Sequence, residues 1–276
     1  MANKGVELEL NYIPVNKKNF TWKINLNLTH YKNKITYLPD EKKTTVMDGH
    51  GGYMNGSRYY GEDLPINTWY MKRFAGLSED GLSLWYYTDK ETNEEKTTTT
   101  YSTGDFYLCG DPNPDLYGGF GTSITFHGFD LSTQFSYLVG GLTYDYGYAG
   151  MMGNPTATSV GNRWHKDVLK AWSPENPSST IPRWYFNDLN TTGSSDRFLI
   201  DGSYLNLQNI QVGYTLPDSW TSHLKIKNLR LYFVCDNVYY WSKRKGLDPR
   251  RSISGVGTSG KIAPFRTYSG GISLQF

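Results

Sequence analysis

The segments 5–13, GVELELNYI, and 20–31, FTWKINLNLTHY, decide the fold, because apolar and polar residues alternate along both of them. The apolar residues at every second position are Val6, Leu8, Leu10, Tyr12, Trp22, Ile24, Leu26 and Leu28. A period of two places successive side chains on opposite faces of a β-strand. The polar stretch PVNKKN between the segments predicts a turn, so the two segments are expected to form an antiparallel hairpin.

The same alternation predicts five further strands downstream. They lie within 115–126, 129–141, 203–216, 227–241 and 266–276. In 203–216 the pattern changes phase, because Leu205 and Leu207 have one parity whereas Ile210, Val212 and Tyr214 have the other. This change predicts a β-bulge near Gln208. Helical periodicity is almost absent, and its best candidate, 162–172, is expected to be a short loop segment.

The connections between these strands differ strongly in length. Short turns are expected at 15–19, 127–128 and 217–225, and long excursions at 32–114, 142–202 and 242–264. Short and long connections alternate along the chain, which is typical of a barrel that crosses the outer membrane with short periplasmic turns and long extracellular loops. To keep this alternation, 67–76 and 82–89 are interpreted as local sheet or loop within the first excursion. The sequence therefore predicts an all-β fold, an antiparallel transmembrane β-barrel section of about seven strands.

The composition agrees with this interpretation. Aromatic residues make up 16% of the chain, against only 38% for all hydrophobic residues, and there are 29 glycines. No apolar run reaches the length of about 18 residues that a membrane helix needs. The net charge of +2 with no basic stripe argues against nucleic-acid binding. Cys109 and Cys235 show no metal or redox spacing.

A soluble, secreted β-sandwich that binds carbohydrate is the alternative fold and function. Alternation alone does not distinguish the two, since the polar face of a sandwich would meet solvent. The regular alternation of short and long connections and the aromatic residues at strand ends favour the membrane barrel.

No motif for catalysis accompanies the histidines, so the protein is not expected to be an enzyme, and no catalytic residue, metal site or cofactor is assigned. Binding is the more plausible chemistry, since the flat CH faces of sugars stack on aromatic rings. The candidate substrate-binding aromatics of the external loops are Trp69, Tyr70, Trp85, Trp164 and Trp184. The alternative reading of each is packing between loops or against a partner protein.

Several stretches together resemble the C-terminal part of SusC/RagA-type TonB-dependent outer-membrane transporters of Bacteroidetes. They are NKGVELELNY at 3–12, GDPNPDLYGGFGTSITFHGFDLSTQFSYLVGG at 110–141, WSPENPSSTIPR at 172–183, DGSYLNLQNIQVGYTLP at 201–217, DNVYYWSKRKGLDPR at 236–250 and APFRTYSGGISLQF at 263–276. They occur in the order of that family and cover nearly the whole chain.

The resemblance implies the last strands of a barrel of about 22 strands in the Gram-negative outer membrane. It also implies nutrient uptake energised by TonB, a SusD-like surface lipoprotein as partner, contact with outer-membrane lipids, and oligosaccharide or peptide as cargo. The family's plug domain, TonB-contacting segment and signal peptide are not in this sequence. Residues 1–276 are therefore expected to be a C-terminal barrel fragment, with a natural end at Phe276 and an internal start at Met1.

Overall fold

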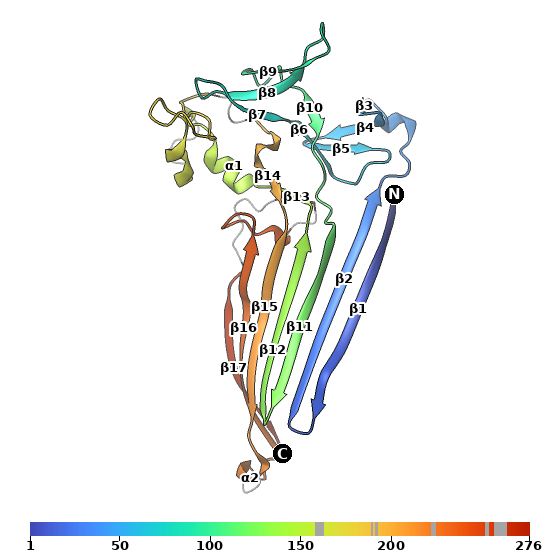
Figure 1. Cartoon of the computed structure of the whole chain (residues 1–276), viewed down its shortest axis with the longest axis vertical. Helices are drawn as coiled ribbons and strands as arrows, with labels where there is room; N and C mark the ends of the chain where they lie inside the picture. Colours follow the sequence, from blue (N-terminus) through green and yellow to red (C-terminus); the bar gives the residue numbers. More distant parts are fainter. Residues whose placement is uncertain (158–162, 189, 191–192, 222–224, 252–253, 257–263) are drawn as a thin grey trace.

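The structure, a computed structural model, describes residues 1–276 except 158–162, 189, 191–192, 222–224, 252–253 and 257–263. A long, curved antiparallel sheet forms a wall, and a head of smaller sheets and loops lies at one end of it (Figure 1). The N-terminus lies at the head end of the wall and the C-terminus at the opposite end.

The wall contains the seven strands that the sequence predicts, each paired with the next in the order β1-β2-β11-β12-β15-β16-β17. Their bounds are β1 Ala2–Lys17, β2 Phe20–Lys34, β11 Leu116–Phe126, β12 Phe129–Val139, β15 Tyr204–Thr215, β16 Asn228–Ser242 and β17 Thr267–Gln275. All six pairings are antiparallel. The all-β, antiparallel fold class is confirmed.

The predicted alternation of short and long connections is also confirmed. The first turn is tighter than expected, because β1 continues to Lys17 after a register shift between Tyr12 and Val15. The second turn consists of His127 and Gly128, whose φ angles of 48° and 87° suit a two-residue hairpin. The third contains a one-turn helix, α2 Asp218–Thr221, at the end of the wall away from the head (Figure 1).

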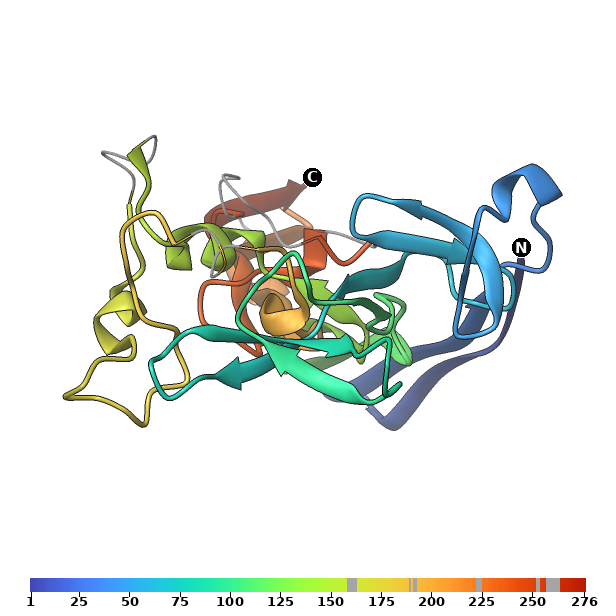
Figure 2. The same ribbon diagram turned by 90° about the horizontal axis from the view of Figure 1, so that it is seen from above.

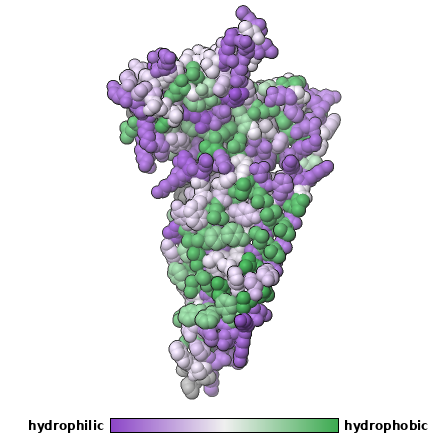
Figure 3. Space-filling view, in the orientation of Figure 1, coloured by the Kyte–Doolittle hydropathy of each residue, from purple (hydrophilic) through white to green (hydrophobic). Residues whose placement is uncertain are grey.

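One face of the wall is apolar across all seven strands. Residues directly opposite each other share a face, so the register can be followed from strand to strand. One such row is Leu10, Leu26, Phe120, Phe135, Leu207 and Tyr239. Large side chains on this face stay exposed, including Leu10 at 48% and Phe233 at 50%. Figure 3 shows hydrophobic residues gathered over the wall and hydrophilic residues over the head.

The predicted bulge near Gln208 is what keeps this face continuous. On the β12 side, Gln134 pairs with Asn209 and the next residue, Phe135, pairs with Leu207, so Gln208 is left without an opposite residue. The extra residue brings Leu207 and Ile210 onto the same face in spite of their different parity.

No second sheet covers the apolar face within the described ranges. A sandwich requires two sheets packed about 10 Å apart, so this architecture does not match the sandwich alternative. No helix in the described part of the chain is long and apolar enough to cross a membrane.

Within the described residues, the head contains three small antiparallel sheets. Their orders are β10-β6-β5-β4-β3, β7-β8-β9 and β13-β14. The strand bounds are β3 Thr45–Met47, β4 His50–Asn55, β5 Arg58–Gly61, β6 Thr68–Lys72, β7 Phe74–Leu77, β8 Ser83–Thr88, β9 Glu95–Thr98, β10 Phe106–Leu108, β13 Leu142–Tyr144 and β14 Leu199–Asp201. The stretches 67–76 and 82–89 are therefore local sheet in the first excursion, as predicted.

Short helices complete the head. Those in the described part of the chain are α1 Tyr146–Met152 and the 3-10 helices η1 Asp40–Lys42, η3 Lys166–Lys170, η4 Asp196–Phe198 and η6 Pro249–Arg251. The helical candidate 162–172 holds only η3 within its described residues, and the sequence did not predict α1. Seen from above, β3, β4 and β5 lie at one side of the head, near β1 and β2, and α1 lies toward the other (Figure 2). The head has its own core of Trp69, Met71, Tyr144, Met152 and Phe198.

Candidate functional site

Amide side chains form a row across the middle of the wall's polar face, which is opposite the apolar face. The positions paired along this row are Asn11, Asn25, Gly121, Gln134, Asn209 and Asp236. Asn209 Nδ2 donates to Asp236 Oδ1 over 2.7 Å, and Asn25 Nδ2 donates to Gln134 Oε1 over 3.5 Å. Amides both donate and accept hydrogen bonds, so the row offers both functions to a polar ligand.

Gly121 makes room for this row. A Cβ at Gly121 would lie 2.2 Å from Gln134 Oε1 and 2.5 Å from Asn25 Oδ1. The two amides therefore occupy the space above the glycine and meet across β11. Any side chain at this position would push them apart.

An ion pair links β12 to β16 nearer the short turns. Arg230 Nε and Nη2 donate to the two carboxylate oxygens of Asp130 over 2.9 and 2.6 Å. The pair passes over Gly213 of β15, where a Cβ would lie 2.5 Å from either partner. A bidentate pair of this kind fixes both side chains and is stronger than a single charged hydrogen bond.

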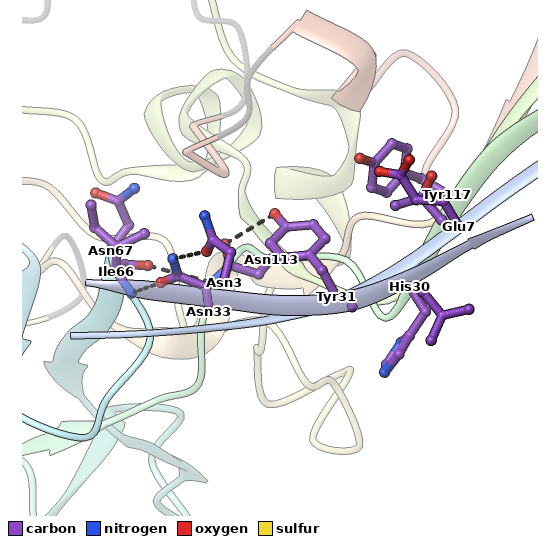
Figure 4. Close-up of a pocket in the computed structure, with 12 residues that line it drawn as sticks. Asn3, Glu7, His30, Tyr31, Asn33, Ile66, Asn67, Asn113 and Tyr117 are labelled. Atoms are coloured by element: carbon purple, nitrogen blue, oxygen red, sulfur yellow. Dashed lines mark hydrogen bonds between the residues drawn. The ribbon is translucent and has the colours of Figure 1, made fainter. Parts of the chain in front are cut away.

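A cavity of about 790 Å³ lies where the polar face meets the head. Its lining is rich in asparagine and tyrosine, with side chains from β1, β2, β11 and two head loops (Figure 4). Asn33 Nδ2 donates to Asn3 Oδ1 over 2.6 Å, and Asn33 Oδ1 accepts from the backbone N of Ile66 over 2.8 Å. Asn33 therefore joins the first two strands to the head.

The aromatic part of this cavity consists of Tyr31 and Tyr117. Their rings meet edge to face, with centroids 6.1 Å apart and planes at 85°. The Tyr31 hydroxyl donates to Asn113 Oδ1 over 3.5 Å, as Figure 4 shows. Glu7 is the one carboxylate in the lining and has no ion pair among the described residues. Tyrosine rings, amides and one carboxylate suit a neutral ligand with many hydroxyl or amide groups.

No sequence pattern predicts that these cavity residues form a site. Asn3, Tyr31 and Asn33 belong to strands, and Asn113 lies in the GDPNPD turn, where Asp111 Oδ1 accepts from its backbone N over 2.9 Å. Only the register of β1 and β2 together with the fold of the head brings them together. The sequence feature that could have identified them is their position: Tyr31 and Asn33 occupy odd-numbered positions of β2, as the residues of its polar face do.

Three of the five predicted substrate-binding aromatics lie in the interior of the head. Trp69 is fully buried, Trp85 is 1% exposed and Tyr70 is 7% exposed. The Arg58 guanidinium lies 3.1 Å from the Trp69 ring centroid and donates to the backbone oxygen of Asn67 over 2.6 Å. These rings have no open face on which a sugar could stack.

The other two predicted aromatics contact each other in the head. Trp164 and Trp184 meet edge to face with centroids 5.4 Å apart. Trp184 is 39% exposed, and its Nε1 donates to the backbone oxygen of Gly153 over 3.2 Å. This contact fixes the ring while part of its surface stays open to a ligand.

Buried cations stabilise the head from within. Lys72 is 4% exposed, and its Nζ donates to the backbone oxygens of Tyr101, Ser102 and Gly104 over 2.6, 3.2 and 2.5 Å. Burial lowers the pKa of Lys72 and lowers that of Arg58 to about 10. The carbonyl oxygens that accept hydrogen bonds from both groups favour their charged forms.

No cluster of three or more His, Cys, Asp or Glu side chains in the described ranges is arranged to hold a metal ion. The four histidines of the described ranges are also dispersed. His30 Nδ1 and His50 Nδ1 contact backbone oxygens at 2.5 and 2.8 Å, and His165 lies 3.1 Å from Asp167.

A curved antiparallel wall with one apolar face, one amide-rich face and a head at one end defines a section of transmembrane β-barrel. Comparison with known proteins agrees. The chain is 28% identical over its whole length to TonB-dependent receptor P3 of Formosa agariphila, covering 29% of that protein. It is 26% identical to TonB-dependent receptor SusC of Bacteroides thetaiotaomicron, covering all of this chain and 26% of that one.

Among solved structures, the RagAB peptide transporter superposes on 99% of this chain with a TM-score of 0.81 and 23% identity. The chain covers 29% of that structure. No protein-family model matches. The predicted resemblance to the C-terminal part of SusC/RagA-type TonB-dependent receptors is confirmed. The chain spans less than a third of the length of the relatives described here.

Proposed function

We propose that residues 1–276 are the C-terminal part of the barrel domain of a TonB-dependent receptor that takes up nutrients across the Gram-negative outer membrane. The observation that carries this proposal is the pair of continuous faces on the seven-stranded wall. The apolar face would contact lipid, the amide row would line the aqueous interior, and the head would face the cell exterior.

Oligosaccharide is the proposed cargo. The large cavity supports this, because its tyrosines, amides and single carboxylate match a neutral ligand that carries many hydroxyl groups. Trp164 and Trp184 would add a stacking surface on the head. Peptide is the alternative cargo, since the structurally similar RagAB is a peptide transporter.

The proposed partners are a SusD-like surface lipoprotein and TonB. The lipoprotein would bind the head, where aromatic side chains are exposed beside Trp184; Tyr185 is 63% and Phe186 61% exposed. TonB would act through a part of the receptor that lies outside this chain. Both partners rest on the resemblance to SusC/RagA-type receptors.

Uptake of a labelled oligosaccharide tests the proposal. A bacterial strain that lacks the gene for the full receptor is complemented with the wild type, with Trp184→Ala, or with Leu169→Ala. Leu169 is a matched control, because it is an apolar head residue that is 90% exposed. Loss of one aromatic contact is expected to reduce uptake by about three- to tenfold in Trp184→Ala.

The amount of receptor in the outer-membrane fraction is measured in parallel. The expected result is equal amounts of all three proteins, with full uptake in the Leu169→Ala strain. Absence of the receptor from the outer membrane, or unchanged uptake of every tested oligosaccharide in the deletion strain, would contradict the proposal.

A further inference from the structure

A second cavity, of about 360 Å³, lies in the head and has a different chemical character from the first. Its lining includes the guanidinium groups of Arg197 and Arg244, the carboxylate of Asp145, the rings of Phe74, Tyr148 and Phe198, and Thr180. A volume of this order is at the lower end of the range for ligand pockets, about 300–1,000 Å³. It has room for one compact group of a larger ligand.

The charge of Arg244 is already matched. Its Nε donates to Asp145 Oδ2 over 2.5 Å, and its Nη2 contacts the same oxygen. Its Nη1 donates to the backbone oxygen of Lys245 over 3.2 Å. The other oxygen of Asp145 accepts from the backbone N of Tyr148 over 3.0 Å. The Asp145 carboxylate therefore accepts hydrogen bonds both from Arg244 and from the backbone at the start of α1.

Arg197, in contrast, has no acidic partner among the described residues. Its guanidinium lies 4.9 Å from the ring centroid of Phe198 and 5.4 Å from that of Phe74. Among the described residues it has no ion pair, and no side chain or backbone oxygen accepts a hydrogen bond from it. Burial lowers the pKa of Arg197 to about 10, which still leaves it protonated at neutral pH. A guanidinium has five N–H donors, and Arg197 is partly exposed at the wall of this cavity, so these donors are available to a ligand.

We propose that this cavity binds a carboxylate carried by a compact, partly apolar group, with Arg197 as its charged partner. The planar fork of a guanidinium matches the two oxygens of a carboxylate. The aromatic walls would contact the apolar surface of the same group. The proposal rests on the proposed uptake function, because it assigns to the head a second, acid-selective subsite for cargo.

Two kinds of cargo carry this chemistry: a uronic acid residue of an acidic oligosaccharide and the C-terminal residue of a short peptide. The larger cavity does not offer the same recognition, because its one charged side chain is the carboxylate of Glu7. An acidic group is therefore expected to bind at Arg197.

Isothermal titration of the detergent-purified full receptor with two pairs of probes tests the subsite. The first pair is digalacturonic acid and its neutral counterpart, galactobiose, and the second is trialanine and trialanine amide. Charged hydrogen bonds predict that one of the acids binds at least about tenfold more tightly than its neutral counterpart. The pair that shows the preference identifies the kind of cargo.

Substitutions at Arg197 test whether this residue causes the preference for the acid over its neutral counterpart. Arg197→Gln is expected to remove it, and Arg197→Lys to keep part of it, because lysine keeps the charge without the planar fork. Lys90→Gln, an exposed change between β8 and β9, is the charge-matched control and is expected to keep it. Equal near-ultraviolet circular dichroism of the four proteins establishes that the head is intact.

Two results would overturn the inference: no preference for either acid in the wild type, or the same preference in Arg197→Gln. A receptor that imports a neutral oligosaccharide but prefers neither acid would overturn this inference alone and leave the proposed uptake function in place.

Discussion

Replacing Leu26 by arginine is expected to destabilise the membrane-inserted receptor far more than replacing its neighbour Asn25. The two residues are adjacent in β2, but Leu26 is paired with Leu10 and Phe120 on the apolar face, whereas Asn25 lies on the amide-rich face. Leu26→Arg therefore places a charge against lipid, and Asn25→Arg places the same charge in the aqueous interior.

The depth of Leu26 follows from the length of β2. Leu26 lies six residues from Phe20, the end of the strand at the short turn. At about 3.4 Å per residue this is about 20 Å along the strand. A tilt of about 40° leaves about 15 Å across the bilayer, close to the middle of an apolar band about 25 Å tall. Arginine at that depth costs about 2–4 kcal/mol.

Urea titration of the full receptor in lipid vesicles, followed by tryptophan fluorescence, measures the free energy of unfolding. Leu26→Arg is expected to lower this free energy by about 2–4 kcal/mol, and Asn25→Arg by less than about 1 kcal/mol. Equal losses for the two variants, or a larger loss for Asn25→Arg, would refute the assignment of the two faces.

Three further predictions concern the wall and the head. Gly118→Ala is expected to destabilise the receptor more than Gly121→Ala in the same urea titration. A Cβ at Gly118 would lie 2.1 Å from a backbone oxygen of the neighbouring strand, which cannot move aside. At Gly121 the nearest contacts of a Cβ would be the ends of two amide side chains, which can rotate away. The reverse order would show that the register of β11 is wrong. Lys72→Met is expected to free three backbone oxygens and cost about 2–4 kcal/mol, seen as faster hydrogen exchange in 101–104; unchanged exchange there would contradict it. Burial raises the pKa of the Cys109 thiol to about 11 from 9.0, so the folded protein holds this proton more tightly. The stability that this provides is present below pH 9.0 and is lost as the pH rises toward 11. Alkylation of Cys109 by iodoacetamide should accelerate over the same interval. Fast alkylation at pH 8 would contradict the raised pKa.

The fold of the wall could be predicted from the sequence because one face of each strand is apolar. The period of two identifies such strands directly, and even the bulge at Gln208 appears as a change of phase. The turn after β1 was predicted too long, because Val15 and its neighbours pair with β2 in spite of their polar composition. Pairing with a strong partner strand outweighed local turn propensity there.

The head could be predicted only in outline. Its strands are short and its contacts join distant parts of the chain, such as Trp69 with Tyr144 at 5.9 Å between ring centroids. Tyrosine and tryptophan serve equally well in a core and in a binding surface, so composition alone does not separate Trp85, which is buried, from Trp184, which is not. No sequence pattern predicts the cavity at Arg197. It is identified only from the structure, in which Arg197 has no acidic partner among the described residues.

The most direct test of the two-faced wall is a spin-label scan of β15 in the full receptor inserted in lipid vesicles. Single labels at each position from 204 to 215 are compared for their accessibility to oxygen, which concentrates in lipid, and to a water-soluble nickel chelate. The expected oxygen-accessible positions are 205, 207, 210, 212 and 214, with the phase inverted at 208. An uninterrupted period of two through Gln208, or equal exposure of both faces to the chelate, would contradict the assignment of this wall to a membrane barrel.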